Sequence, residues 1–342
     1  MKNQRSYLKM AVGAAVMCAS LLPVALAGAN SAGAAGSVKV FMIPKFTGVA
    51  PFTQAAAGCK TEGAKLGLNC LYGGPTTASA VDQVNFINNA VAAGDKGIFI
   101  SNDDAATANP ALVRAEKHGV KVVTFDSDSL PSGRTVYVEG TSTASIALTE
   151  LNMVGSQMKP AFTGKFIILS AQATDSNQVT WNNQVKADLK LPKYKKMQLA
   201  AIINPPSDSA SDATSSLQAA LASDPSVKGI ISPTTVGIAA AAQYLTTNKL
   251  CSKYVLTGLG DPNQMKPFMS NNCVHSFALW NFTQEGKVAA CAMSNVLSGK
   301  LTGKTGQSFM CDGVKEVVLP GQTISAGNAT IFTKANVGSA GF

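Results

Sequence analysis

The chain has 342 residues, of which 46% are hydrophobic and 14% are charged, and its 28 basic and 19 acidic residues give a formal net charge of +9. Such a chain is long enough for two domains with buried cores, and its composition excludes a disordered or coiled-coil protein. The basic residues are scattered, and their densest run is Lys193, Lys195 and Lys196. Because nucleic-acid-binding proteins concentrate basic residues on one face or tail, we expect no nucleic-acid partner.

The first 36 residues have the pattern of an export signal. Three cations in the first nine residues precede an apolar run from Met10 to Leu26, and Ala25-Leu26-Ala27 fits the small-x-small cleavage rule. We therefore interpret residues 1–27 as a signal peptide and 28–36 as a tether, which predicts a periplasmic or secreted protein. A membrane anchor is the alternative, but no stop-transfer charges follow. Met17 stands before Cys18 where a lipoprotein signal needs a small residue, so we expect no lipid.

Six further cysteines follow, and an even number in an exported chain indicates disulfides. Six cysteines allow fifteen pairings in principle, but the spacing favours three local ones. These are Cys59–Cys70, Cys251–Cys273 and Cys291–Cys311. Free buried thiols are the alternative. We expect no metal, because there is no CxxC pair and the two histidines are remote from each other.

From Ser37 on, short aliphatic runs alternate with longer stretches of helical periodicity. The first half predicts strands at Val38–Ile43, Cys70–Gly73, Gly97–Ser101, Val120–Phe125 and Val136–Val138, and helices at Phe52–Leu66, Val81–Ala93 and Pro110–His118. The strands are continuous apolar runs without alternation, which indicates a parallel sheet covered on both faces.

The same rhythm then restarts. The second half predicts strands at Lys165–Ala171, Met197–Ile203, Gly229–Ser232, Tyr254–Gly258 and Ser276–Leu279, and helices at Asp175–Lys190, Ser209–Ala222, Val236–Thr247 and Pro262–Ser270. Helices at Thr141–Met158 and Thr283–Leu297 follow strands directly, as where a chain crosses a hinge. Strand-like pieces in the tail, Glu316–Leu319 and Ala329–Phe332, are expected to complete both halves.

This pattern predicts an α/β fold of two doubly wound, Rossmann-like lobes with parallel sheets, joined by a hinge of several strands. We assign residues 37–140 and 282–315 to the N-terminal lobe, and residues 141–281 and 316–342 to the C-terminal lobe.

Ligands of open α/β sheets bind beyond the carboxyl ends of the strands. The expected strand ends carry carboxylates, amides, one lysine and aromatic side chains. Such groups suit a sugar, since vicinal hydroxyls need bidentate partners and the C–H face of the ring packs on an aromatic. The candidate ligand-binding residues are Lys45, Phe46, Phe52, Asp103, Asp126, Asp175, Ser176, Thr235, Trp280 and Asn281.

Some of these residues have plainer alternative roles. Asp175 can cap the following helix, Asp103 can cap its loop, and Trp280 can belong to the core. An enzyme is disfavoured, because no Walker loop, GxGxxG or GxSxG motif is present and acid–base chemistry would rest on carboxylates alone. We therefore expect no catalytic residue and no cofactor.

Six short stretches in order resemble the type I periplasmic binding proteins of the ribose-binding class. They look most similar to the autoinducer-2 and rhamnose-binding branch of sugar ABC transporter binding proteins. The stretches are Phe41–Gly48, Gln83–Asn89, Gly119–Asp128, Thr174–Gln178, Ala239–Gln243 and Leu279–Asn281. They extend over nearly the whole chain that follows the expected signal.

The resemblance implies that Lys45, Asp126 and Asp175 bind ligand hydroxyls and that a backbone carbonyl near Thr235 contributes. It also places Ser176 where the family has Gln, and Asn281 where it has Asp. Both changes alter the hydroxyl pattern that such a pocket accepts.

The resemblance implies an exported monomer that captures a monosaccharide, deoxyhexose or polyol and delivers it to the permease of an ABC importer. The alternatives are an autoinducer-2 receptor or a ligand carrier for a chemoreceptor or sensor kinase. A secreted α/β hydrolase is a remote possibility. A sugar-responsive repressor needs an N-terminal helix-turn-helix, where this chain has the expected export signal.

Overall fold

The structure, a computed structural model, describes residues 37–340, so the expected signal peptide and tether lie outside the described residues. It contains a six-stranded sheet in the order β13-β5-β4-β3-β1-β2 with all pairs parallel. These strands are β1 (Val38–Ile43), β2 (Leu68–Tyr72), β3 (Gly97–Ile100), β4 (Lys121–Phe125), β5 (Val136–Glu139) and β13 (Thr323–Ser325).

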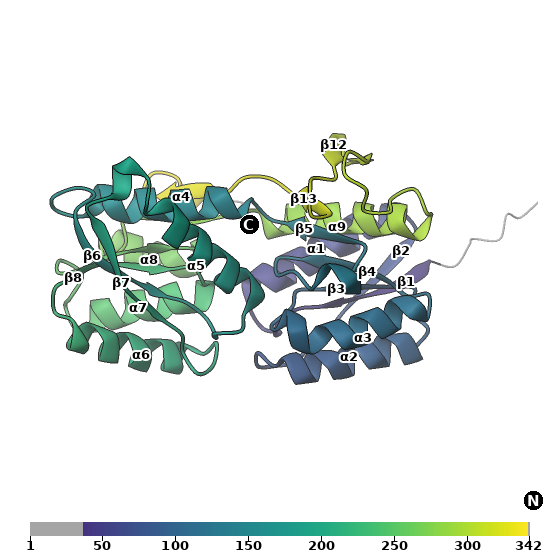
Figure 1. Cartoon of the computed structure of the whole chain (residues 1–342), viewed down its shortest axis with the longest axis horizontal. Helices are drawn as coiled ribbons and strands as arrows, with labels where there is room; N and C mark the ends of the chain where they lie inside the picture. The colour runs from purple at the N-terminus through teal and green to yellow at the C-terminus, as the bar shows by residue number, and fades with distance from the viewer. Residues whose placement is uncertain (1–36, 341–342) are drawn as a thin grey trace, which may run out of the picture. The chain divides into compact units, whose positions relative to one another are not determined.

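Helices cover both faces of this first sheet (Figure 1). On one face α1 (Ala50–Lys65) and α9 (Phe282–Leu297) pack against each other, and α9 also contacts β4. On the other face, α2 (Ala80–Ala92) and α3 (Ala105–Lys117) form a separate apolar cluster with the strands. The backbones of α1 and α9 approach closely, since a Cβ on Gly58 or Gly286 would overlap backbone atoms of the partner helix.

The second sheet has the order β7-β6-β8-β9, again all parallel. Its strands are β6 (Gly164–Leu169), β7 (Met197–Ile203), β8 (Val227–Ser232) and β9 (Val255–Gly258). A parallel bridge between Leu259 and Ala278 adds β10 (Ser276–Leu279), which pairs antiparallel with β14 (Thr330–Thr333).

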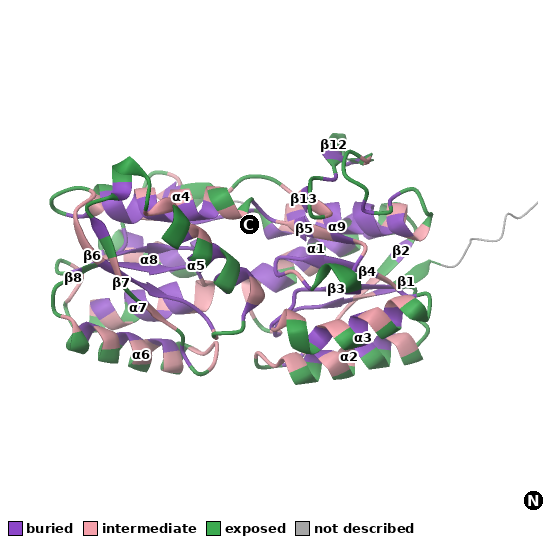
Figure 2. Ribbon diagram, in the orientation of Figure 1, coloured by how far each residue is buried: buried purple, intermediate pink, exposed green. Residues whose placement is uncertain are grey.

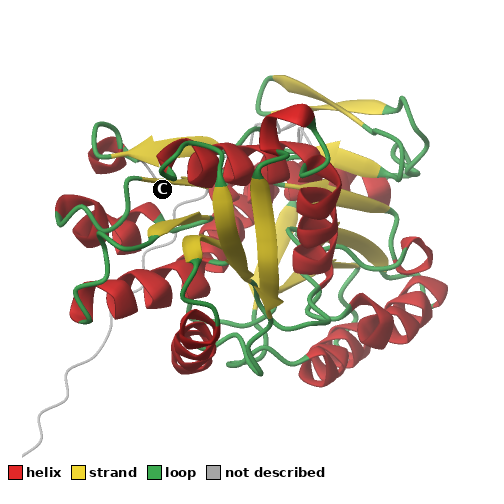
Figure 3. Cartoon of the chain, turned by 60° about the vertical axis from the view of Figure 1, so that its left-hand side comes forward, coloured by secondary structure: helices red, strands yellow, loops and turns green. Residues whose placement is uncertain are grey.

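Helices lie on either side of these strands as well (Figure 3). Buried side chains of α4 (Thr143–Gln157) and α5 (Ser176–Asp188) share one cluster with β6. The remaining helices are α6 (Ala210–Ser223), α7 (Thr235–Thr247) and α8 (Pro262–Ser270). No helix within residues 37–340 is long and apolar enough to cross a membrane.

The central strands are buried on both faces, as Figure 2 shows. All four residues of β3 are buried, and so are the last four residues of β4 and β6. The uninterrupted apolar runs therefore correspond to parallel strands covered on both sides. This confirms the α/β fold class predicted from the sequence.

The chain passes between the two sheets three times: from β5 to α4, from β10 to α9, and from β13 to β14. The tail thus adds one strand to each sheet. This corrects part of the sequence-based division, which placed all of 316–342 with the second lobe, because β13 pairs with β5 of the first sheet. We retain two lobes, one around each sheet, as a proposal.

Two expected elements have different bounds. The helix expected at Pro110–His118 begins at Ala105, because the Asp104 side chain accepts hydrogen bonds from the amides of Ala106 and Thr107 and caps it. The strand expected at Glu316–Leu319 is part of a hairpin formed by β11 (Ser308–Cys311) and β12 (Val314–Val317).

Within residues 37–340 the structure contains three disulfides, Cys59–Cys70, Cys251–Cys273 and Cys291–Cys311. These are the pairs that the spacing favoured, so the pairing prediction is confirmed. The first links α1 to β2, and the third links α9 to the hairpin of β11 and β12.

Candidate functional site

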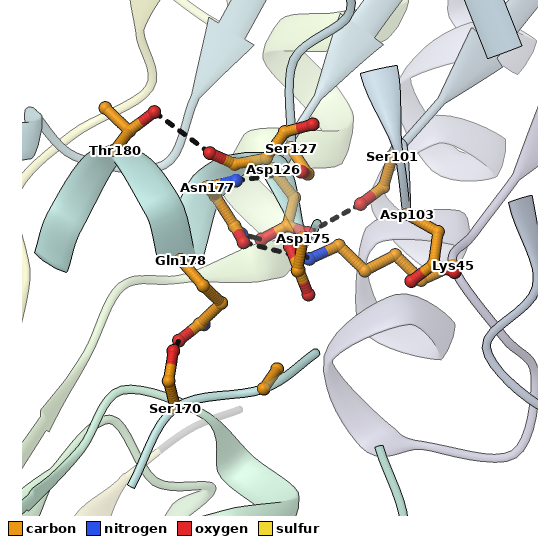
Figure 4. A network of polar contacts seen from close by, with 12 residues as sticks. Lys45, Ser101, Asp103, Asp126, Ser127, Ser170, Asp175, Asn177, Gln178 and Thr180 are labelled. Atoms are coloured by element: carbon orange, nitrogen blue, oxygen red, sulfur yellow. Dashed lines mark hydrogen bonds and ion pairs between the residues drawn. The ribbon is translucent and has the colours of Figure 1, made fainter. Parts of the chain in front are cut away.

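Lys45 lies in the loop after β1, and its ammonium group contacts residues at the start of α5. It donates hydrogen bonds to Oδ1 of Asp175 at 2.5 Å and to Oδ1 of Asn177 at 2.9 Å (Figure 4). All three side chains are buried. Asp175 occupies the N-cap position of α5 without making a capping hydrogen bond, since its carboxylate is paired with Lys45. The capping alternative for Asp175 is therefore not what the structure shows.

Gln83 of α2 holds the loop of Lys45 in place. Its amide nitrogen donates to the carbonyls of Pro44 and Ser101, and its oxygen accepts from the backbone amide of Asp103. The fully buried side chain of Gln83 thus links the carboxyl ends of β1 and β3. This link fixes the backbone from which the Lys45 side chain extends.

Asp126 follows β4 and has a left-handed backbone with a φ of 57°. Few residues other than glycine adopt this conformation, so the surroundings must hold it. The Ser101 hydroxyl donates to its carboxylate at 2.6 Å, and the Tyr137 hydroxyl donates to its carbonyl at 2.8 Å. Its backbone amide donates to Glu285 of α9 at 2.7 Å. The carboxylate therefore has a fixed position beside Asn177, whose amide nitrogen lies 3.4 Å away.

Burial dominates the electrostatics of these acidic groups. It raises the pKa of Asp175 to about 7, although Lys45 opposes the shift. Burial also raises the pKa values of Asp126, Asp103 and Asp208, again against the influence of Lys45. Burial alone would lower the pKa of Lys45, but the charges of Asp175 and Asp126 outweigh it and the pKa is raised. The site thus holds an ammonium group among carboxylates whose desolvation it offsets only in part.

One pocket of about 500 Å³, its opening to solvent included, collects these groups. Its polar lining includes Lys45, Asp126, Asp175, Asn177, Gln178 and Asp208. Aromatic rings form its apolar wall: Trp280 stacks on Phe282 with ring centres 4.9 Å apart, and Trp181 meets Trp280 edge to face. Phe46 and Phe52 form a further edge-to-face pair on the same wall. Charged acceptors beside aromatic faces can bind hydroxyl groups and pack apolar C–H surface at once.

A family model described as periplasmic binding protein domain matches residues 40–301. The chain belongs to this family. The family is one of binding proteins, and the two-sheet fold and the pocket agree with that role. Within residues 37–340, no group of three or more His, Cys, Asp or Glu side chains is placed to hold a metal ion.

Solved structures of other proteins match nearly the whole chain. A sugar ABC transporter from Actinomyces odontolyticus is 34% identical with a TM-score of 0.71, covering 90% of this chain and 98% of that one. A solute-binding protein from Clostridium phytofermentas with bound L-rhamnose is 29% identical with a TM-score of 0.84, covering 89% and 98%. LsrB from Clostridium saccharobutylicum in complex with AI-2 is 26% identical with a TM-score of 0.81, covering 89% and 100%. The resemblance to sugar ABC transporter binding proteins is thereby confirmed.

Seven of the ten candidate residues line the pocket of this periplasmic binding protein. They are Lys45, Phe46, Phe52, Asp126, Asp175, Thr235 and Trp280. Three do not. The Ser176 hydroxyl accepts from the amide of Ala105, and Asn281 caps α9 by accepting from the amide of Gln284. Asp103 is held to α2 by its backbone amide, which donates to the Gln83 side chain.

The sequence analysis missed several pocket residues. Asn177 and Gln178 lie in the stretch Thr174–Gln178, which carries part of the resemblance and follows an expected strand. This position after a strand was a signal that both side chains could reach the pocket. The Gln178 amide donates to the carbonyl of Pro233 and its oxygen accepts from Ser170, so it supports the pocket wall. Asp208 lies in a loop after β7 and had no sequence signal.

The two sheets are also linked directly at this site. Besides the Lys45–Asp175 pair, the amide of Asn177 donates to the Ser127 hydroxyl at 3.3 Å. These contacts arise because α5 begins against the ends of β1 and β4 and supplies hydrogen-bond partners to both.

Proposed function

We propose that this periplasmic binding protein is exported, captures a small polyhydroxylated molecule in the pocket, and delivers it to an ABC importer. The ligand is a monosaccharide, a deoxyhexose or a polyol. The observation that carries the proposal is the pocket itself, in which Lys45, Asp126 and Asp175 lie beside the rings of Trp280 and Phe46. Binding of L-rhamnose and of AI-2 by relatives that are 29% and 26% identical supports it.

Hydroxyl groups meet the needs of this site. The carboxylates of Asp126 and Asp175 can each accept further hydrogen bonds, and each sugar hydroxyl donates one hydrogen bond while it can accept another. The ammonium of Lys45 has three hydrogens and uses two on Asp175 and Asn177, which leaves one for a ligand oxygen. Because these groups are buried, bonds to them are stronger than the same bonds in water.

We also propose a narrower set of contact residues than the sequence suggested. Asp208 and Asn177 join Lys45, Asp126 and Asp175 as polar contacts. Three of the earlier candidates do not contact the ligand but form hydrogen bonds that hold the backbone around the pocket; they are Ser176, Asn281 and Asp103. On this proposal the changes from Gln to Ser at 176 and from Asp to Asn at 281 affect ligand choice less than Asp208 does.

A thermal-shift screen tests the proposal. The panel contains L-rhamnose, D-arabinose, D-ribose, xylitol and autoinducer-2, with a dicarboxylate and an amino acid as controls. A ligand present at 100 times its dissociation constant stabilises the folded protein by about 2.7 kcal/mol. We expect a shift with at least one sugar or polyol and none with the controls. Stabilisation by the controls alone would refute the proposed ligand class.

The second candidate function is that of an autoinducer-2 receptor. The similarity to LsrB in complex with AI-2 favours it. The same screen separates the two candidates, since a receptor for autoinducer-2 should prefer that compound to every sugar in the panel.

Export is part of the proposal and has its own test. The motif Ala25-Leu26-Ala27 predicts that the mature chain begins at Gly28. Intact-mass measurement of protein from the exporting host should give the mass of residues 28–342. Retention of Cys18 with added lipid mass would contradict it. We further propose that the exported protein is a monomer, which light scattering checks.

A further inference from the structure

Glu285 is a fully buried carboxyl group in the first turn of α9 and does not line the pocket. Its two oxygens have different partners. Oε1 accepts from the backbone amide of Asp126 at 2.7 Å, and Oε2 accepts from the indole Nε1 of Trp280 at 2.8 Å. Both partners line the pocket: Asp126 follows β4 of the first sheet, and Trp280 follows β10 beside the second.

Each partner needs support of this kind. Asp126 has a left-handed backbone, and its amide is otherwise held only by a longer bond of 3.2 Å to the carbonyl of Val138. Trp280 lies directly against Gly140, where any Cβ would overlap the indole ring. The ring therefore cannot move closer to the backbone at Gly140. A buried indole N–H that loses its acceptor is left unpaired, which destabilises the position of the ring.

We infer that Glu285 is a positioning residue that sets the Asp126 carboxylate and the Trp280 ring at a fixed separation across the pocket. Glu285 does not touch the ligand. It fixes the distance between a polar contact and an aromatic surface, and this distance selects among ligands of different ring size and substitution. α9 carries this residue directly after the chain passes from the second sheet to the first.

Close packing makes α9 a rigid support for this role. Gly286 follows Glu285, and a Cβ there would overlap the backbone of Ala55 in α1. The helix therefore has no room to shift toward α1, and Phe282 in its first turn contacts Phe52 edge to face. The carboxyl accepts both bonds in either protonation state, because a protonated oxygen keeps an acceptor site.

Two substitutions at Glu285 have graded effects. In Glu285→Gln the amide oxygen satisfies one N–H group, and the NH₂ group faces the other donor. Glu285→Ala leaves both donors without their acceptor. We expect affinity for L-rhamnose to fall about tenfold in Glu285→Gln and about 100-fold in Glu285→Ala. Trp280→Phe removes one donor and keeps the anchor of Asp126, so Glu285→Gln should cost less affinity in that background than in wild type.

The matched control is Glu150→Gln. Glu150 is also a buried glutamate, but it lies in α4, outside the pocket lining, and its Oε1 has no hydrogen-bond partner within the described residues. We expect this variant to bind L-rhamnose as wild type does. A loss of affinity as large as that in Glu285→Gln would mean that any buried acid matters, and it would overturn the inference.

Two readouts do not need a ligand. With only two tryptophans in the sequence, Trp181→Phe leaves Trp280 as the single tryptophan, and Glu285→Gln in that background should shift the emission of selectively excited tryptophan. Hydrogen exchange at the Asp126 amide should become about tenfold faster in Glu285→Ala. Unchanged emission together with unchanged exchange would overturn the inference.

The inference rests on the proposed function only for its choice of probe. If wild type binds neither L-rhamnose nor D-arabinose, the failure concerns the proposed function, and fluorescence and exchange still decide the role of Glu285. If wild type binds L-rhamnose and both Glu285 variants bind it equally well, the positioning role is wrong while the proposed function stands.

Discussion

The ammonium of Lys45 and the carboxylate of Asp175 lie 2.5 Å apart although 130 residues separate them in the chain. Only 6% of the Lys45 side chain and 3% of the Asp175 side chain are exposed. Their ion pair joins the end of β1 to the beginning of α5, at the centre of the candidate pocket. A buried pair of this kind is costly to break from one side, because the remaining charge is left without a partner.

The first prediction concerns this pair. Asp175→Ala should weaken sugar binding about 30- to 1000-fold, because it removes a charge-assisted contact and leaves Lys45 unpaired, at a cost of roughly 2–4 kcal/mol. Lys45→Ala should have a similar effect. The double variant should lose less than the sum of the two single losses, since the second change removes the charge that the first left unpaired.

Calorimetry with the strongest ligand from the screen measures this coupling. The control is Asp312→Ala, which removes an exposed carboxylate that forms ion pairs with Lys287 and Lys65 away from the pocket lining. That variant should bind as wild type does. Strictly additive losses in the double variant would contradict the role we give to the pair.

The second prediction is a pH dependence of binding. Burial raises the pKa of Asp175 to about 7, and a ligand hydroxyl that donates to the carboxylate favours its charged form. Binding should therefore release a proton, and affinity should rise from pH 5 to about pH 7 and then level off. Asp126 and Asp208, which are also proposed contacts, have raised pKa values and shift affinity in the same direction.

Calorimetry in buffers of different ionisation enthalpy counts the released protons. Asp175→Asn should reduce the number released near neutral pH. An affinity that falls as pH rises from 5 to 7 would show that the sign is wrong.

The third prediction concerns the close approach of Gly140 and Trp280. Gly140→Ala places a Cβ where the indole ring lies, so Trp280 must move and the aromatic wall changes. Sugar affinity should fall by at least about tenfold, and tryptophan emission should change. Gly338→Ala is the control, because no atom lies within 4 Å of its added Cβ. Unaltered binding in Gly140→Ala would show that Trp280 does not contact the ligand.

The fourth prediction concerns stability and Glu150. Burial raises the pKa of this glutamate to about 8, so between pH 4.5 and 8 the folded protein keeps a proton that the unfolded chain releases. This group therefore contributes stability at low pH that is lost as pH rises toward 8, by at most about 1.4 kcal/mol per pH unit. Urea unfolding from pH 5 to pH 8 should show a smaller decline in Glu150→Gln than in wild type. An equal decline in both proteins would contradict it.

Much of the fold was predictable because it follows from local pattern. Apolar runs such as Gly97–Ser101 are long enough to be strands and too uniform to be half-exposed, so they indicated parallel sheets. The same pattern placed Lys45 and Asp126 at the carboxyl ends of strands in the first sheet, and Asp175 beyond the carboxyl end of β6 in the second, where ligands of such sheets bind. The positions of these three residues after expected strands were therefore enough to select them as pocket residues, and the conformations of the loops were not needed.

The rest depended on geometry that the pattern does not contain. Ser176 and Asn281 are next to pocket residues in sequence, but each side chain binds a backbone amide instead. Asp208 reaches the pocket through the conformation of a loop with two prolines. β13 has three residues, which are too few to show the sequence pattern of a strand. It becomes a strand because it pairs with β5.

The placement of β13 also has a consequence for how the molecule folds. The edge strand on one side of the first sheet is β13 (Thr323–Ser325), and its neighbour β5 ends at Glu139, almost two hundred residues earlier in the chain. Contacts between residues so far apart in the chain slow the search for the native state. During synthesis, β5 remains an open edge until nearly the entire chain has emerged, and open edges invite pairing with other chains. A truncation before residue 323 should therefore favour aggregation over a free first lobe.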